Sequence, residues 1–438
     1  MTLRSTLLAG LCTLALSGCV VSVTDTERPA MLAPIAHAPI ANDAPHGISQ
    51  SRLQVLDATM KRYVEEQKLA GAVVMIHQDG REVFSEAYGW RDREAGDRME
   101  EDDIFRIASQ TKALTSVAIM MLMEEGKLLL EDPLSKFLPE WSKTTVAVAK
   151  DKGGYEVVPA KRAITLRDLM SHSAGISYGS GPGEQAWRDA GVFGWYFADK
   201  TVPVADIVAK MPKLPMAAQP GEAWVYGYNT DILGVVVEKV SGQSLDVFFR
   251  ERITGPLGMT DTSFCLPPDK ASRLAVVYSA KDGKSERAPD PGSWQGSGHI
   301  GQGHYLNGPC KAFAGGAGLL STARDYSRFL EMLRQGGTFE GRRYLSRKSV
   351  EQMSQDALVT ATFQPSQGFG LGFRITEDPG AMGNLGSKGD YGWGGAYHST
   401  YWIDPAEGLT VSFMTQLIPA GGLDTQAKLR ALIYAAVE

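Results

Sequence analysis

The segment from Thr111 to Leu130 most restricts how this chain can fold, because its side chains are apolar on nearly every face of a helix. Its middle reads VAIMML, with no polar side. A helix that is apolar all round is buried by other elements on every side. The chain has 438 residues, of which 43% are hydrophobic, which is enough for a sizeable core. The sequence therefore predicts a large globular body with this helix inside it.

The composition excludes several classes of protein. Lys and Arg number 44 and Asp and Glu number 50, so the formal charge is −6, spread along the chain. A nucleic-acid-binding protein needs clustered basic residues, so we expect no nucleic-acid partner. A mean hydropathy of −0.15 excludes a multi-span membrane protein and a disordered chain. Four cysteines are too few for a scaffold built on disulfides.

The first nineteen residues resemble a bacterial lipoprotein signal. Arg4 supplies a positive charge, an apolar run from Leu7 to Leu16 follows, and the string Leu-Ser-Gly-Cys that ends at Cys19 resembles a lipobox. The apolar run is too short to span a bilayer of about 30 Å. We therefore expect residues 1–18 to be a signal peptide and Cys19 to be lipidated. An ordinary secretory signal that contains a cysteine is the alternative.

Residues 19–47 are rich in Ala and Pro and show no sustained period. Repeated proline blocks helix formation and favours an extended tether. A tether after a lipidated Cys19 would hold the rest of the chain at a membrane. We therefore expect a lipid-anchored protein on the periplasmic side of the bacterial cell envelope, with the outer membrane favoured over the inner.

From residue 48 onward the pattern changes from β to helical and back to β. Two β-rich runs around Asp79-Gly80 predict a hairpin, because Asp-Gly is a strong turn signal. Strands are predicted near the other end, over 397–403 and 409–415. Helical spacing is found over residues 51–66, 165–172, 203–211, 229–241, 244–251, 322–336 and 424–436.

This order indicates an α+β fold in which one sheet is built from both chain ends. A mostly helical lobe interrupts it. We expect one domain over 48–438, with its α/β part over about 48–105 and 315–438 and the helical lobe over about 106–314.

The tetrapeptide Ser109-Gln110-Thr111-Lys112 is the strongest candidate for chemistry. Residues three apart lie on one helical face, so the Lys112 amine can reach the Ser109 hydroxyl. Serine is a poor nucleophile unless a base removes its proton, and burial among apolar neighbours favours the neutral lysine that could do so. Alone, the motif is short, and Ser109 as a helix cap with a solvated Lys112 is the alternative.

A second serine, Ser177, lies in Gly175-Ile176-Ser177-Tyr178-Gly179 and fits G-x-S-x-G. That motif needs a strand before the serine and a helix after it. Here a helical stretch precedes it and a loop follows, so we interpret Ser177 as a loop residue. His172 and Asp168 would complete a triad with it, but we interpret both as structural.

Metal and cofactor signatures are missing from the sequence. The seven histidines form no HExxH motif, and His299 and His304 share one loop without a third ligand. We also find no phosphate-binding loop and no dinucleotide fingerprint. We therefore expect no metal and no cofactor. Cys265 and Cys310 are an even pair that could form a disulfide or remain as two buried thiols.

Several further motifs follow in a fixed order and make the chain resemble a known superfamily. From about residue 50 to the C-terminus it resembles the serine β-lactamases and penicillin-binding proteins, in the class C-like branch called family VIII carboxylesterases. The segments that carry this resemblance are SQTK (109–112), ITLRDLMSHSAGI (164–176), WVYGYNTDILG (224–234), AGGAGLLSTARDYSRFLEML (314–333), GFGLGF (368–373) and WGGAYHSTYWIDP (393–405).

The resemblance implies a β-lactamase-like fold with a mainly antiparallel sheet and flanking helices. It implies that Ser109 is the nucleophile, Lys112 its base partner and Tyr226 a third proton-transfer group. The β-lactamases have Tyr-x-Asn at this point, whereas this chain has Tyr-Gly-Tyr, as family VIII members often lack the Asn. Alignment on Asp231 favours Tyr226 over Tyr228.

The third motif separates the esterases from the β-lactamases. β-Lactamases carry Lys-Ser/Thr-Gly, whose cation attracts a substrate carboxylate, whereas this chain has Trp393-Gly394-Gly395, as the esterases do. An indole offers apolar contact instead, so we expect these three residues to line the substrate pocket. The backbone N–H groups of Ser109 and Ala396 are expected to form the oxyanion hole. The triplet that begins at Ser387 (SKG) is a loop lookalike.

We therefore predict a serine hydrolase that cleaves short-chain carboxylic esters through an acyl-enzyme with a Ser-Lys-Tyr centre. One alternative is a β-lactamase or D-alanyl-D-alanine carboxypeptidase of the same fold. The other is a non-catalytic envelope lipoprotein that uses the fold as a binding module.

Overall fold

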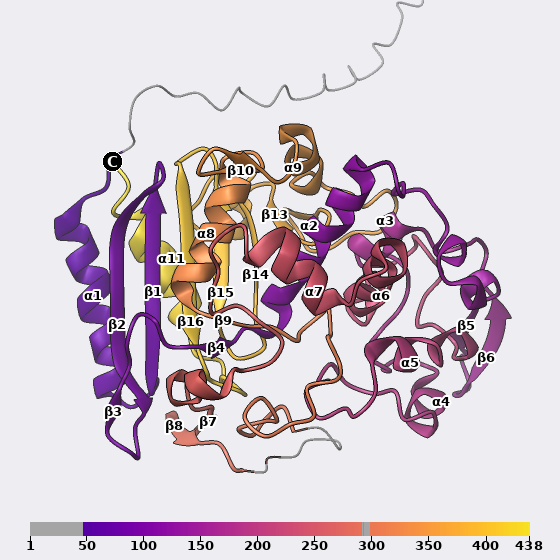
Figure 1. Ribbon diagram of the computed structural model, residues 1–438, viewed down its shortest axis with the longest axis horizontal. Coiled ribbons are helices and arrows are strands. Elements are labelled where there is room, and N and C mark those ends of the chain that lie inside the picture. The colour runs from indigo at the N-terminus through magenta and orange to yellow at the C-terminus, as the bar shows by residue number, and fades with distance from the viewer. Residues whose placement is uncertain (1–46, 291, 293–297) are drawn as a thin grey trace, which may run out of the picture. The chain divides into compact units, whose positions relative to one another are not determined.

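An antiparallel sheet joins the two ends of the chain. The computed structural model describes residues 47–290, 292 and 298–438, and within them the main sheet has the strand order β12-β13-β14-β15-β16-β1-β2-β3. Its centre is the pairing of β1 with β16, in which Val74 lies opposite Phe413 (Figure 1). The predicted α+β fold, with one sheet built from both ends, is confirmed. The strands are β1 (Gly71–Gln78), β2 (Arg81–Asp92), β3 (Asp97–Arg98), β12 (Gln367–Phe369), β13 (Arg374–Thr376), β14 (Tyr391–Gly394), β15 (Thr400–Asp404) and β16 (Leu409–Thr415).

The predicted hairpin is present, with Asp79 and Gly80 both at positive φ (50° and 78°) between β1 and β2. Such a turn matches the twist of the flanking strands. The strand predicted over 397–403 begins later, at Thr400. The reason is a tight turn, in which the N–H of Gly395 donates to the carbonyl of Ser399 at 2.9 Å.

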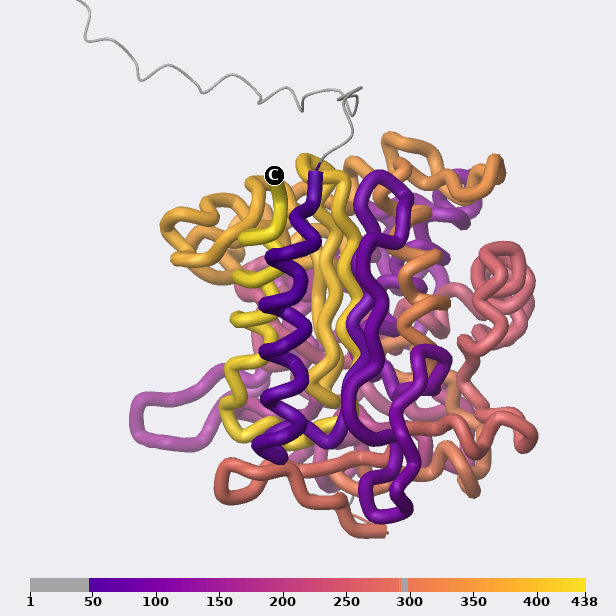
Figure 2. The backbone as a smooth tube through the Cα atoms, turned by 90° about the vertical axis from the view of Figure 1, so that its left-hand side faces the viewer, coloured from indigo at the N-terminus to yellow at the C-terminus, as the bar shows by residue number. Residues whose placement is uncertain are grey.

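Helices cover both faces of the sheet. On one face α1 and α11 pack against each other, and Figure 2 shows α1 lying along the strands. On the other face α8 packs on β16 and β1. The side chain of Thr322 caps α8 by accepting from the N–H of Asp325. The helices are α1 (Gln50–Glu65), α2 (Thr111–Glu124), α3 (Leu166–Met170), α4 (Glu184–Asp189), α5 (Val204–Val208), α6 (Asn229–Ser241), α7 (Leu245–Phe249), α8 (Ala323–Arg334), α9 (Arg347–Met353), α10 (Pro379–Met382) and α11 (Thr425–Tyr434).

The helix predicted to be apolar on nearly every face is α2. Every residue from Thr111 to Leu122 is buried, as predicted, but the helix ends at Glu124 rather than at Leu130. Gly126 follows at φ +70°, a left-handed conformation that ends helices. The helix packs against α6 of the lobe, so it joins the lobe to the sheet.

The region between the two parts of the sheet is mostly helical, and it also contains short β pairs that the sequence analysis did not assign. The pair β5–β6 belongs to the lobe, and β7–β8 lies beside the sheet (Figure 1). The short strands are β4 (Phe105–Arg106), β5 (Thr145–Ala149), β6 (Tyr155–Pro159), β7 (Tyr278–Lys281), β8 (Lys284–Arg287), β9 (Leu320–Ser321), β10 (Thr338–Phe339) and β11 (Arg342–Arg343).

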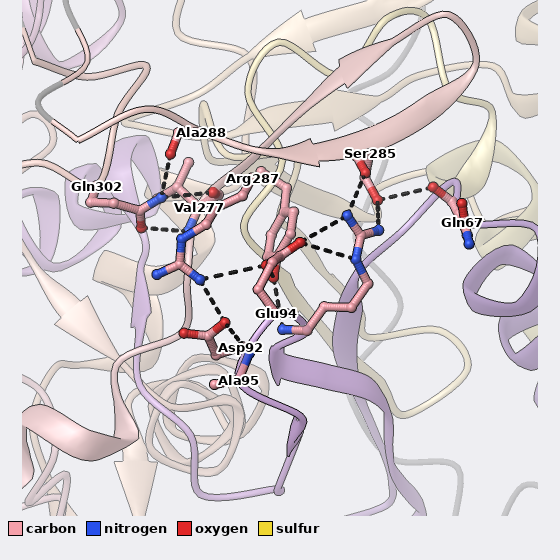
Figure 3. A network of polar contacts seen from close by, with 11 residues as sticks. Gln67, Asp92, Glu94, Ala95, Val277, Ser285, Arg287, Ala288 and Gln302 are labelled. Atoms are coloured by element: carbon pink, nitrogen blue, oxygen red, sulfur yellow. Dashed lines mark hydrogen bonds and ion pairs between the residues drawn. The ribbon is translucent and has the colours of Figure 1, made fainter.

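Polar contacts hold the β7–β8 hairpin against the sheet (Figure 3). Arg287 donates to Asp92 at 2.5 Å, and the hydroxyl of Ser285 donates to the carbonyl of Gln67 at 2.9 Å. The side chain of Gln302 makes two bonds with the backbone of Val277 (Figure 3). These contacts fix the hairpin, and those of Gln302 fix that residue beside Val277.

The described chain begins beside its own C-terminus, where the N–H of Glu438 donates to the carbonyl of Gly47 at 2.9 Å. Among the described residues, no helix has the length and apolar character needed to cross a bilayer. The predicted signal peptide, Cys19 and nearly all of the predicted tether lie outside the described residues.

Candidate active site

Ser109 lies at a sharp change of chain direction between β4 and α2. It is the middle residue of a short 3-10 helix, η1 (Ala108–Gln110), and it is half-buried. The residue before it, Ala108, is buried and has φ +43°, a left-handed conformation that is costly for alanine. Strain of this kind persists only where the surrounding structure imposes it, and it clusters at functional sites.

Lys112 is almost fully buried, and its amine lies at the centre of three hydrogen bonds. Nζ donates to the Ser109 hydroxyl at 3.2 Å, to the Tyr178 hydroxyl at 3.0 Å and to the Gly316 carbonyl at 2.7 Å. These partners use all three protons of an ammonium group. The predicted contact between Ser109 and Lys112 across one helical turn is therefore present in the structure.

Tyr226 lies just before α6, and its ring is beside the same amine. Lys112 Nζ is 4.7 Å from the ring centroid, which is a cation–π contact. The Tyr226 hydroxyl accepts a hydrogen bond from the indole Nε1 of Trp393, at 3.1 Å. Tyr228, the competing candidate, is buried elsewhere and donates its hydroxyl proton to the Gly194 carbonyl at 2.7 Å.

Tyr178 is a residue of the site that the sequence analysis missed. It is the tyrosine whose hydroxyl bonds Lys112, and its ring packs edge-on against Tyr226 at 5.6 Å between centroids. Burial raises the pKa of Tyr178 well above its usual value, so the phenol keeps its proton at neutral pH. The signal that could have found it is its position next to Ser177 in the G-x-S-x-G segment.

Ser177 itself makes no triad with His172 and Asp168. Its hydroxyl donates to the Ser180 carbonyl at 2.6 Å within the loop. The Asp168 carboxylate binds Arg162 and accepts from the N–H of Thr165, the residue that caps α3.

His172 packs against the Tyr226 ring, with 4.8 Å between the ring centroids. Its Nδ1 is 2.8 Å from the amide nitrogen of Asn229. Burial lowers the pKa of His172 well below its usual value, and the charge of Lys112 acts in the same direction. The ring is therefore neutral and supports Tyr226 by packing.

A buried carboxylate lies behind Lys112. Oδ1 of Asp231, in the first turn of α6, accepts from the N–H of Gly316 at 2.9 Å, and Gly316 uses its carbonyl to hold Lys112. Burial raises the pKa of Asp231 to about 6, while the charge of Lys112 acts in the opposite direction. A side chain at Gly316 would place its Cβ 2.6 Å from Oδ2 of Asp231, so the position requires glycine.

These groups meet at a cavity of about 500 Å³. It is lined by Ser109, Tyr178, Trp195, Tyr226, Arg374, Trp393, Gly394, Gly395, Ala396, Ser399, Thr400 and Gln426. The residues predicted for the nucleophile, the tyrosine and the pocket are thus on one surface. The SKG lookalike lies outside this lining, and its Gly389 donates to the carbonyl of Thr376.

The turn between β14 and β15 lies directly against the segment that carries Ser109. A Cβ added to Gly395 would lie 2.5 Å from the carbonyl oxygen of Ile107, so only glycine permits this approach. Both Ala396 and Ser109 line the cavity. Among the described residues no acceptor is found for the N–H of Ala396, which leaves this donor available to a ligand.

Two further predictions concern the cysteines and the histidines. Cys265 and Cys310 form a disulfide pair with their Cα atoms 5.8 Å apart. The His299 ring packs on Trp195 at 5.2 Å. Within the described part of the chain, no cluster of His, Cys, Asp or Glu is arranged to hold a metal ion.

The sequence matches the Beta-lactamase family over residues 56–435. An uncharacterized protein of Mycobacterium tuberculosis is 34% identical over 391 residues, which covers 84% of this chain and 91% of that protein. Esterase EstB of Burkholderia gladioli is 29% identical over 374 residues, which covers 82% of this chain and 89% of that protein. Among solved structures, EstCE1, a hydrolase with promiscuous acyltransferase activity, has a TM-score of 0.75 at 26% identity and covers 88% of this chain and 99% of its own.

The predicted resemblance to the serine β-lactamase and penicillin-binding-protein superfamily, with esterases among the relatives, is confirmed by these matches and by the shared fold. The chain belongs to the Beta-lactamase family.

Proposed function

We propose that this chain hydrolyses short-chain carboxylic esters through an acyl-enzyme formed on Ser109. The observation that carries the proposal is the 3.2 Å contact between Lys112 Nζ and Ser109 Oγ, on the wall of a cavity that Tyr226 also lines. A buried amine in contact with a serine hydroxyl is the arrangement that activates a serine without histidine. The esterases among the relatives support an ester as the substrate.

The reaction proceeds in two halves. In the first, Ser109 Oγ bonds to the ester carbonyl carbon while its proton passes to the Lys112 and tyrosine pair. The bond to the alcohol then breaks, and the alcohol leaves with that proton. In the second half, water gives its proton to the same pair and attacks the acyl carbon, and Ser109 takes a proton as the acid leaves.

The hydrogen bonds around Lys112 are compatible with this transfer. A neutral amine has two protons and one lone pair, so one of its three contacts must then reverse direction. The hydroxyl of Ser109 can reverse by donating to Nζ, because a hydroxyl both donates and accepts. The Gly316 carbonyl and Tyr178 then keep the amine in place.

The negative charge on the carbonyl oxygen is held by the backbone N–H groups of Ser109 and Ala396. Two preorganised donors in a site sheltered from water supply a large part of the stabilisation in acyl transfer. The exclusion of a side chain at Gly395 keeps the turn that carries Ala396 close to the serine segment.

Two activities of the same fold and one binding role are the alternatives. β-Lactam and D-alanyl peptide substrates also present an acyl carbon to one serine. Trp393 stands where the β-lactamases have a cation for the substrate carboxylate, and its indole contributes apolar contact instead. This difference replaces a charged contact by an apolar one at Trp393, which counts against a β-lactam as the substrate. The third alternative is a binding module that forms no acyl-enzyme.

One kinetic comparison tests the proposal. Wild type, Ser109→Ala and Ser177→Ala are assayed on 4-nitrophenyl esters of increasing acyl length and on nitrocefin. We expect ester turnover that is strongest for short acyl chains, lost in Ser109→Ala and kept in Ser177→Ala. Nitrocefin turnover equal to ester turnover would favour a β-lactamase. No turnover and no acyl labelling would favour the binding module.

We also propose that Cys19 carries a lipid that anchors the chain on the periplasmic side of the bacterial envelope, at the outer membrane rather than the inner. Support comes from the charge, apolar run and Leu-Ser-Gly-Cys order of the first nineteen residues. Cys19→Ser should release the protein from the membrane fraction. Wild type that fractionates with soluble proteins would contradict the anchor.

A further inference from the structure

One charged group lies in the proposed substrate cavity. Of the described residues that line it, only Arg374, on β13, carries a formal charge. The other lining residues are aromatic, small or neutral polar. About 28% of the Arg374 side chain is exposed.

The guanidinium of Arg374 has no hydrogen-bond partner among the described residues. Its Nε is buried and unpartnered. The carboxylate nearest to it, that of Asp390, is 3.9 Å from Nη2, which is too far for a hydrogen bond. An arginine carries five N–H donors, and leaving buried donors unpaired is costly.

Asp390 is occupied by other partners. Arg430 donates to its Oδ2 at 2.5 Å, and the hydroxyl of Thr376 donates to its Oδ1 at 2.9 Å. Two guanidinium groups therefore share one carboxylate, and the trio of Arg374, Asp390 and Arg430 carries one net positive charge. Only Arg374 of the three lines the cavity.

A second unpartnered donor lies in the same cavity. The hydroxyl of Ser399 is buried without a partner. Gln426 and Thr400 complete this polar part of the lining. Gln426 donates to the carbonyl of His398, which leaves its own amide oxygen unused.

We propose that Arg374 binds a free carboxylate on the substrate, so that the preferred ester is a monoanion with a carboxylate in addition to the ester group that is cleaved. The planar fork of a guanidinium matches the two oxygens of a carboxylate, and such charge-assisted bonds are the strong ones. This inference rests on the proposed ester hydrolysis and adds the chemical class of the substrate.

The inference is tested with esters matched in pairs. On the acyl side, mono-4-nitrophenyl glutarate is compared with 4-nitrophenyl valerate. On the alcohol side, 4-butyryloxybenzoate is compared with 4-butyryloxybenzamide. We expect kcat/KM to favour the carboxylate member of at least one pair by about tenfold, the least that one charged hydrogen bond supplies.

The variant Arg374→Gln should abolish this preference, because it removes the cation that binds the carboxylate. Arg374→Lys should retain part of the preference. Raising NaCl from about 0.05 M to about 0.5 M should lower kcat/KM for the carboxylate substrates and leave that for the neutral esters unchanged. Arg430→Gln is the matched control, because Arg430 shares Asp390 but does not line the cavity.

Each outcome decides between two conclusions. If kcat/KM of the neutral ester equals that of its carboxylate partner in both pairs, and both depend on Ser109, the inference is overturned and the esterase proposal stands. An equal loss of preference in Arg374→Gln and Arg430→Gln would also overturn it, since the effect would then come from Asp390. Absence of Ser109-dependent turnover on all four esters would instead contradict the esterase proposal itself.

Discussion

The indole N–H of Trp393 donates a hydrogen bond to the hydroxyl of Tyr226, with 3.1 Å between the two atoms. Because an indole N–H only donates, Tyr226 must accept, and its own proton is free to point to another group. Trp393 comes from β14 and Tyr226 from the segment just before α6, so this bond joins the sheet to the helical lobe at the cavity wall. The tryptophan therefore orients the proposed proton-transfer residue besides lining the pocket.

Removal of this bond should lower turnover. Trp393→Phe keeps an aromatic ring but loses the donor, so we expect kcat on 4-nitrophenyl butyrate to fall about fivefold to tenfold, the effect of one neutral hydrogen bond. Trp224→Phe is the control, because Trp224 stacks on the Tyr226 ring without bonding its hydroxyl. Equal losses in the two variants would show that only ring packing matters.

Removal of the hydroxyl should lower kcat by different amounts at the two tyrosines near Lys112. Tyr226→Phe removes the hydroxyl that lines the cavity and whose proton is not donated to Trp393. We expect kcat to fall by about 100-fold or more. Tyr178→Phe removes one partner of Lys112, and we expect a fall of about tenfold. Steady-state kinetics on one ester measures both.

Tyr228→Phe serves as the control for the tyrosine variants. Its hydroxyl bonds the Gly194 carbonyl, so its loss should lower the melting temperature and leave kcat nearly unchanged. A larger fall in kcat for Tyr178→Phe than for Tyr226→Phe would assign the proton transfer to Tyr178.

The buried carboxylate of Asp231 should make stability depend on pH. Its pKa is raised from 3.8 to about 6, so the folded chain binds more protons than the unfolded chain between these values. The free energy of unfolding therefore falls as pH rises from about 4 to about 6. The contribution of this one group to the fall is about 3 kcal/mol.

Urea unfolding of wild type and Asp231→Asn measures this contribution. The amide does not titrate, so the stability of wild type relative to the variant should decrease between about pH 4 and about pH 6 and stay level above. A stability difference that is constant over this range would show that Asp231 has an ordinary pKa in the fold.

The pairing of Cys265 with Cys310 closes a long loop and should stabilise the lobe. The two residues are 45 positions apart, and a cross-link of that span contributes about 4 kcal/mol by restricting the unfolded chain. Reductant should therefore lower the melting temperature of wild type by several degrees. The double variant Cys265→Ser/Cys310→Ser should melt at the lower temperature with or without reductant. Insensitivity of wild type to reductant would contradict the stabilising role.

Local signals were sufficient to predict the elements with strong patterns. The Asp79-Gly80 turn, the strand Leu409–Thr415 and the capped helix after Thr322 each depend on neighbouring residues, and each is present as predicted. The contact of Ser109 with Lys112 is likewise local, because helical spacing alone brings the two together.

Contacts between distant segments could not be predicted in the same way. Tyr178 is 66 residues from Lys112 in sequence, and only the folding of the lobe onto α2 brings its hydroxyl to the amine. Arg374 reaches the cavity because β13 pairs with β14, a register that a short strand does not encode by itself. The strand β15 begins late, at Thr400, because Gly395 and Ser399 form a turn, which depends on the close approach to Ile107.

The central claim is that Ser109 carries the acyl group, and mass spectrometry of the trapped enzyme tests it most directly. Wild type is mixed with 4-nitrophenyl butyrate, quenched in acid within the burst phase, digested and mapped. We predict a butyryl adduct on the peptide that contains Ser109, and none on the corresponding peptide of Ser109→Ala. An adduct on Ser177, or undiminished turnover by Ser109→Ala, would contradict the account.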